Sequence, residues 1–344
     1  MVYYNQNGRA YNLDEKSFKG GGEGNVYDVI GQPSLVAKIY HANMLDAQIT
    51  AKILAYADFF KSWDSNFRLY TVPPIEPLFD SNRKFAGYIM GKLVGDYVPL
   101  SSIYDADVGK DISYKNKIIT AGNMCVITKL AHDNGVVIGD YNQKNIGVDP
   151  TGKVHLFDND SFQFKANGKT HRCVVGVPEE MAPEIHKALK KEKADLKSVS
   201  APVYNKYTDL YTMALHIFHL LMNGAHPFNS RIEASKLPPS QTVSSATISL
   251  LEASQKAIFI FAHPTVFRKP PKWAPAYEIL SPELRNCFER AFVDGLNHPE
   301  KRPTPDEFYS ALYRYSQELI EYPCGHFHHK SYTGSCEWCR ISKK

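Results

Sequence analysis

Short runs rich in Val, Ile, Tyr and Phe occur in the first part of the chain, residues 1–92. Runs of this composition are typical of strands, and the clearest are 25–30, 35–40 and 85–90. Between them, residues 43–60 carry Ala and Leu at helical spacing and contain neither Gly nor Pro, which predicts a helix. The pattern therefore predicts a small β-rich lobe with one helix.

From about residue 112 the pattern becomes helical. Residues 115–133 carry apolar side chains at helical spacing and stop at an Asn-Gly pair, a common helix end. A larger, mainly helical lobe is therefore expected over 93–320. Its other expected elements are the strand-like runs 136–139 and 154–157 and the helices 209–222 and 305–320.

Composition narrows the class of protein. Hydrophobic residues make up 43% and charged residues 22% of the 344, which excludes wholesale disorder and a fibrous fold. The net charge of +4 is too mild to indicate nucleic acid or a membrane surface as a partner. No apolar run approaches the roughly 18 residues of a spanning helix, and the N-terminus lacks a secretory pattern, so a cytoplasmic location is expected.

A glycine cluster occupies residues 19–27, which read Lys-Gly-Gly-Gly-Glu-Gly-Asn-Val-Tyr. Glycines let the backbone come close to an anionic ligand and present N–H groups to phosphate oxygens. The alternative is an ordinary hairpin between two strands. Lys38 follows inside an apolar strand; such a lysine is either an edge residue with its head in water or, beneath a glycine loop, a phosphate ligand.

Three polar residues in the middle of the chain form the most specific pattern. Asp140 and Asn145 lie five residues apart, and Asp158 follows thirteen residues later. Phosphoryl transfer needs hard oxygen ligands for magnesium, which Asn145 and Asp158 offer, and a proton acceptor, which Asp140 offers. Each acid alone is commonly a turn or cap residue, but the ordered set with the glycine cluster and Lys38 is difficult to obtain by chance.

With these residues, the chain resembles the eukaryotic-like protein kinase superfamily over about residues 12–320. Glu184 would pair with Arg302, as the corresponding residues do in the superfamily. The sequences of these motifs resemble those of a bacterial branch of the superfamily. This branch includes kinases of phosphorylation triads, some of them in tellurite-resistance gene clusters. The matching elements are the glycine loop at 20–27, Lys38, the Asp140 to Asn145 loop, Asp158, and Met181-Ala182-Pro183-Glu184.

The resemblance implies an α+β, two-lobed fold and a Ser/Thr protein kinase. ATP would lie between the lobes, with residues 89–93 as the strand and hinge facing the adenine. Asp140 would be the base, Lys38 would orient the phosphates, and Asn145 and Asp158 would hold Mg²⁺ or Mn²⁺. Implied partners are a protein substrate, the chain itself included, a cognate phosphatase and a von Willebrand A-type protein. The implied nucleotide-binding residues are Gly21, Gly22, Gly24, Val26, Ala37, Lys38 and Met90.

The chain departs from the superfamily pattern at several positions. Lys19 replaces the first loop glycine, Gly139 replaces the arginine before the catalytic Asp, and Asn142 replaces a lysine. Asn159-Asp160 replaces Phe-Gly after the metal-binding Asp.

The predicted helix at 43–60 contains no glutamate to pair with Lys38; Asp46 and Gln48 are the nearest polar candidates. An ATP-binding pseudokinase scaffold therefore remains an alternative. A small-molecule kinase on the same fold is disfavoured by the Met181–Glu184 and Arg302 elements.

The tail, residues 321–344, contains three of the six cysteines. A Cys-x-x-Cys pair with an upstream Cys and several His predicts a closed, structural zinc site of the Cys3His kind. The predicted ligands are Cys324, His328, Cys336 and Cys339, with His326 as the alternative fourth ligand. The other interpretation is an ordinary reduced tail with a surface run of histidines.

Overall fold

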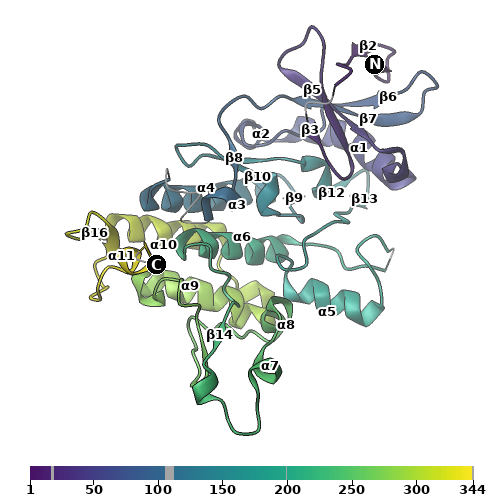
Figure 1. Ribbon diagram of the computed structural model, residues 1–344. Helices are drawn as coiled ribbons and strands as arrows, with labels where there is room; N and C mark the ends of the chain where they lie inside the picture. The colour runs from purple at the N-terminus through teal and green to yellow at the C-terminus, as the bar shows by residue number, and fades with distance from the viewer. Residues whose placement is uncertain (17–18, 105–111, 199, 343–344) are drawn as a thin grey trace.

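The computed structural model describes residues 1–16, 19–104, 112–198 and 200–342. A small lobe built on an antiparallel sheet lies above a larger, mainly helical lobe (Figure 1). This α+β arrangement fits the kinase-like fold that the resemblance implied. Among the helices of the described residues, none has the length and apolar character required to cross a membrane.

The small lobe contains a seven-stranded sheet whose neighbouring strands are all antiparallel, in the order β2-β1-β6-β7-β5-β4-β3. The three strands expected from the sequence are β4, β5 and β7, and the expected helix is α1. A short α2, Ser65–Leu69, follows. The bounds are β1 Val2–Tyr4, β2 Ala10–Asn12, β3 Lys19–Gly20, β4 Gly24–Asp28, β5 Leu35–Tyr40, β6 Glu76–Phe79, β7 Phe85–Gly91 and α1 Ala47–Phe59.

Alternation along β5 separates the two faces of this sheet. Ala37 is fully buried on one face in a cluster with Leu78 and Ile89. Val36 is buried on the other face with Met90 and with Ile53 of α1. Because successive strand residues point to opposite faces, Lys38 shares its face with Val36 and not with Ala37.

The large lobe is organised around α6, Lys206–Leu221, whose side chains are almost all buried. It packs against α4, Tyr114–Asp133, which in turn packs against α10, Pro305–Gln317. The remaining helices are α3 Ser101–Tyr104, α5 Pro183–Glu192, α7 Val243–Ala246, α8 Leu250–Gln255 and α9 Pro282–Phe292.

Two small sheets lie at the side of the large lobe that faces the small lobe (Figure 1). One has the order β11-β10-β8 and the other β13-β12-β9; β14 and β15 form a separate two-stranded antiparallel sheet. Their bounds are β8 Val98–Pro99, β9 Val136–Val137, β10 Ile146–Val148, β11 Val154–Leu156, β12 Gln163–Ala166, β13 Lys169–His171, β14 Arg231–Ile232 and β15 Arg268–Lys269.

The tail folds against the large lobe beside α10 (Figure 1). It consists of a hairpin, β16 Leu319–Glu321 with β17 Phe327–His329, and α11, Glu337–Ser342. Glu337 accepts a hydrogen bond from the backbone N–H of Ala276 at 2.8 Å, which ties α11 to the lobe. The boundary between large lobe and tail, predicted after residue 320, falls inside β16. The last helix was expected to extend to residue 320, but α10 ends at Gln317 and β16 begins at Leu319.

Candidate active site

A cavity of about 560 Å³ lies between the glycine cluster and the small sheets of the large lobe. Its lining includes all four residues predicted to carry the chemistry. They arrive from three separate stretches of chain: Lys38 from β5, Asp140 and Asn145 from the loop after β9, and Asp158 from the end of β11.

The β10–β11 hairpin explains how Asn145 and Asp158 come together. Asn145 directly precedes β10, and Asp158 lies just beyond β11. The strands are antiparallel, with Ile146 opposite Leu156, so the start of one lies beside the end of the other. The Asn145 side chain also donates a hydrogen bond to Asp140 Oδ2 at 3.2 Å, which links Asn145 to Asp140.

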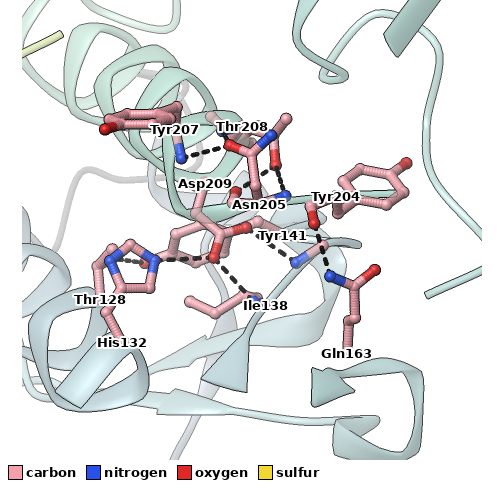
Figure 2. A network of polar contacts seen from close by, with 12 residues as sticks. Thr128, His132, Ile138, Tyr141, Gln163, Tyr204, Asn205, Tyr207, Thr208 and Asp209 are labelled. Carbon is pink, nitrogen blue, oxygen red and sulfur yellow. Dashed lines mark hydrogen bonds and ion pairs between the residues drawn. The ribbon is translucent and has the colours of Figure 1, made fainter. Parts of the chain in front are cut away.

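The backbone just before Asp140 is held by Asp209 of α6 (Figure 2). Asp209 accepts hydrogen bonds from the N–H of Ile138 at 2.8 Å and of Gly139 at 2.9 Å. It also contacts His132 Nε2 at 3.0 Å, and its side chain is only 1% exposed. A buried carboxylate that accepts backbone N–H groups fixes the course of the loop, because leaving those groups unpaired would be costly.

Gly139 has a structural reason to replace the arginine. Its φ of +72° is in the left-handed region, and a Cβ there would lie 2.7 Å from Cys173 Cβ. A larger residue would be strained and would collide with the buried Cys173. The backbone conformation of this loop therefore disfavours an arginine at position 139.

The environment of Asp140 raises the pKa of its carboxyl group to about 6. Burial is the largest cause, followed by the negative charges of Glu23 and Asp158, whereas the hydrogen bond from Asn145 lowers the pKa. A carboxylate whose pKa approaches neutral pH is better suited to accept a proton from a hydroxyl group than an ordinary Asp.

Lys38 contacts three carboxylates. Its Nζ is 2.8 Å from Asp160 Oδ2, 3.3 Å from Glu23 Oε2 and 3.7 Å from Asp158 Oδ1. Burial lowers the pKa of Lys38, but these neighbours outweigh it, with Asp160 first, and the pKa is raised well above its ordinary value. Lys38 is therefore a cation inside the cavity and not a strand-edge residue with its head in water.

The Asp158-Asn159-Asp160 segment is fixed in place. Asp158 has a φ of +50° and precedes a short 3₁₀ turn, Asn159–Ser161. Asn159, only 1% exposed, accepts a hydrogen bond from the N–H of Val72 at 2.6 Å through Oδ1. Where the superfamily pattern has a Phe, this chain has a polar residue whose side chain is hydrogen-bonded to the backbone.

Most residues implied for nucleotide binding line the cavity. Gly21, Gly22, Gly24, Val26 and Met90 do so, as does Lys38.

Ala37 does not line the cavity, because it points to the opposite face of β5; Val36 takes that place. The alternation rule applied from Lys38 would have selected Val36. Glu23 and Asp160, which lie inside the quoted motifs, also line the cavity, and lining residues outside the motifs include Val72, Tyr97 and Phe157.

Gly24 has a second role, which is structural. A Cβ at Gly24 would lie 2.3 Å from the carbonyl oxygen of Ile39 on β5. The close approach of β4 to β5 therefore requires glycine here, whereas a Cβ at Gly22 would meet nothing within 4 Å.

The tail gathers four side chains that together suit a metal ion. Ligand atoms of Cys324, His326, Cys336 and Cys339 all lie within 4.8 Å of one another. His326 Nδ1 is 3.4 Å from the sulfurs of Cys324 and Cys336 and 3.5 Å from that of Cys339. A tetrahedral site with Zn–S of about 2.3 Å and Zn–N of about 2.0 Å needs N–S separations of about 3.5 Å.

His328, the predicted fourth ligand, is not part of this cluster. It is 1% exposed, stacks on Trp338, and contacts only Cys336 among the cysteines, at 3.3 Å. His328 lies within β17, whereas His326 precedes the strand and lies in the turn of the hairpin. The rule that strand residues two apart share a face therefore does not place the two histidines together. The geometry thus favours His326, the alternative, as the fourth ligand.

Comparisons with known proteins bear on the class of protein. No protein-family model matches the chain. Two curated relatives, both described as Protein kinase YegI, come from Escherichia coli strain K12 and from Escherichia coli O157:H7. Each is 29% identical over 335 residues, which cover 94% of this chain and 48% of the relative. The chain thus spans about half the length of these relatives, and the similarity supports a protein kinase-like superfamily.

Proposed function

We propose that this chain is an ATP-dependent protein kinase that phosphorylates serine or threonine hydroxyl groups. One observation carries the proposal: Lys38, Asp140, Asn145 and Asp158 converge on a single cavity beneath the glycine cluster. The cavity has the size range of small-molecule sites, and similarity to proteins described as kinases supports the same reaction.

Each residue would have a distinct task in the transfer. Lys38 would orient the α- and β-phosphates as a fixed cation, and the N–H groups of the glycine loop would contact the phosphate oxygens. Asp140 would accept the proton of the attacking hydroxyl as its oxygen bonds to the γ-phosphorus. The bond from the γ-phosphorus to the β–γ bridging oxygen would break, and ADP would leave.

Asn145 and Asp158 would hold magnesium or manganese. Amide and carboxylate oxygens are the ligands these hard cations prefer, and both side chains line the cavity beside the phosphate-binding elements. The bound ion would supply neutralisation of negative charge on the phosphates.

A transfer assay with γ-labelled ATP tests these roles. Wild type should label itself or a generic protein substrate, whereas Asp140→Asn and Asp158→Asn should lose transfer. Asp133→Asn, on the exposed end of α4, is the matched control and should retain it. If wild type transfers phosphate and both site variants match it, the assigned roles are wrong.

A nucleotide-binding scaffold without transfer is the second candidate. It is favoured by one observation, that α1 contains no glutamate to pair with Lys38. ATP binding without transfer, under varied divalent ions, would select it. The contact of Lys38 with Asp160 supports the active enzyme instead.

We also propose that the tail holds a structural zinc ion through Cys324, His326, Cys336 and Cys339. Zinc would be four-coordinate and closed, and would stabilise the β16–β17 hairpin against α11. Three cysteine sulfurs and one imidazole nitrogen are the kind of donor set that zinc takes in structural sites, so the cluster suits a thiolate-binding metal.

A protein substrate, the chain itself included, follows from the proposed activity. The phosphatase and von Willebrand A-type partners implied by the branch resemblance extend the same proposal. Co-purification from the source cell with this chain as bait would test those two partners.

A further inference from the structure

The three carboxylates around Lys38 differ in their surroundings. The Lys38 side chain is 6% exposed, and that of Asp160 is 4% exposed. Glu23 and Asp158, by contrast, are 38% and 46% exposed. Charge attraction is strongest where water is excluded, so the shortest contact, with Asp160 at 2.8 Å, is also the least screened.

Asp160 is itself held in a fixed position. Tyr40, two residues after Lys38 on β5, donates its hydroxyl hydrogen to the same Oδ2 at 2.6 Å. The turn that carries Asp160 is closed by a backbone hydrogen bond from Ser161 to Asp158 at 3.1 Å. Asp160 therefore bridges β5 and the segment that contains Asp158.

Helix α1 supplies no carboxylate to Lys38 among the described residues. Asp46 caps the start of α1 by accepting from the N–H groups of Gln48 and Ile49. Asp58, near the other end, is 82% exposed and pairs with Lys61.

The buried charge that α1 directs toward the cavity segment is a lysine. Lys52 donates hydrogen bonds to the carbonyl oxygens of Ser161 and Arg172, each at 3.0 Å. The helix thus presents a cation to the backbone of the segment, and the segment presents the acid to Lys38.

We propose that Asp160 is the positioning residue for Lys38, supplying from the segment after Asp158 the carboxylate that superfamily members are expected to carry on the small-lobe helix. This inference rests on the proposed nucleotide-dependent function. The short turn Asn159–Ser161 then positions both the phosphate-orienting Lys38 and the candidate metal ligand Asp158. Helix α1 contacts the strand of Lys38 through the packing of Ile53 and contacts this segment through Lys52.

The test compares Asp160→Asn with Lys38→Met and with the double variant. The matched control is Asp58→Asn, an acid-to-amide change at an exposed lysine pair on α1. Affinity for a non-hydrolysable ATP analogue, kcat and KM are measured, with thermal unfolding as a check on folding. A fourth readout is the labelling rate of Lys38 by an amine-reactive ester without nucleotide, followed by mass spectrometry.

Asp160→Asn should weaken analogue binding about 10- to 100-fold, the effect of losing one charge-assisted hydrogen bond. Lys38 labelling should rise, because the amine loses the 2.8 Å contact that holds it against the buried Asp160. In the Lys38→Met background, Asp160→Asn should have no further effect on binding. Asp58→Asn should match wild type in every readout.

Two results would overturn the proposal: unchanged binding and Lys38 labelling in Asp160→Asn, or a full additional loss in the double variant. If Asp160→Asn does not fold, Tyr40→Phe removes only the hydrogen bond to Asp160 and should shift both readouts in the same direction, more weakly. Absence of transfer by wild type would refute the proposed function alone. The labelling comparison needs no nucleotide, and it still decides the role of Asp160.

Discussion

Arg302 donates two parallel hydrogen bonds to Glu184, from Nη1 to Oε1 at 2.6 Å and from Nη2 to Oε2 at 2.8 Å. The residues are 118 positions apart, and the Arg302 side chain is 0% exposed. Arg302 also donates to the carbonyl oxygens of Tyr207 and Gly295, both at 2.8 Å. The pair expected from the sequence is confirmed, and it fixes the start of α5 against α6.

Glu184→Gln should destabilise the protein by about 3–5 kcal/mol, because it leaves a buried guanidinium without its counter-ion. Denaturant unfolding measures the change. Glu283→Gln, which breaks the half-exposed pair with Arg314, should cost about 1 kcal/mol or less. Equal losses at the two positions would contradict a structural role for the buried pair.

Asp209→Asn should cost about 1–3 kcal/mol and lower kcat. The amide offers only one oxygen where the two backbone N–H groups of Ile138 and Gly139, just before Asp140, need acceptors. Urea unfolding and the transfer assay measure the two effects. Asp133→Asn on the surface should change neither, and an Asp209→Asn enzyme with full kcat would show that the loop keeps its course unaided.

Gly139→Ala should destabilise by more than the backbone cost of a left-handed alanine, which is about 1 kcal/mol or more. The matched control is Gly168→Ala, since Gly168 has the same φ of +72° but a Cβ added there would meet nothing within 4 Å. The difference between the two variants in thermal unfolding isolates the collision with Cys173. Identical losses would remove the steric explanation for the missing arginine.

Metal content should separate the two candidate histidines. His326→Ala and Cys336→Ser should lose about one zinc per chain, whereas His328→Ala should retain it, since a structural site has four ligands. Elemental analysis of protein purified without chelators measures this. Retention by His326→Ala together with loss by His328→Ala would favour His328 as the fourth ligand instead.

Glu180 should make stability fall as pH rises. Burial is the largest cause that raises the pKa of Glu180 to about 7, with Asp140 adding to it. From pH 4.5 to 7 the unfolded chain releases a proton that the folded chain keeps, so the free energy of unfolding decreases, by up to about 3 kcal/mol.

Glu180→Gln should remove this dependence and be more stable than wild type above pH 7, with little difference near pH 4.5. Unfolding at a series of pH values measures it. Glu179→Gln, at the exposed neighbour, is the control. Parallel curves for Glu180→Gln and wild type would contradict a protonated Glu180 in the folded protein.

The sequence alone predicted an α+β fold and named motif residues that line the cavity in the structure. The strand-like run 154–157 before Asp158 was expected, whereas strand β10 after Asn145 was not, and it is the antiparallel pairing of β10 with β11 that brings Asn145 and Asp158 together. The choice of Ala37 failed for a local reason, since strand alternation places Val36 on the face of Lys38.

Only the tertiary structure decided the partner of Lys38. Asp160 is 122 residues away in the sequence, and nothing in its own neighbourhood distinguishes it from a metal-site acid. The same holds for the choice of His326 over His328, which depends on the turn between β16 and β17. A sequence motif indicates which chemical groups a reaction needs. Which charged groups pair inside the protein depends on their burial and separation, and these are determined only when distant segments pack together.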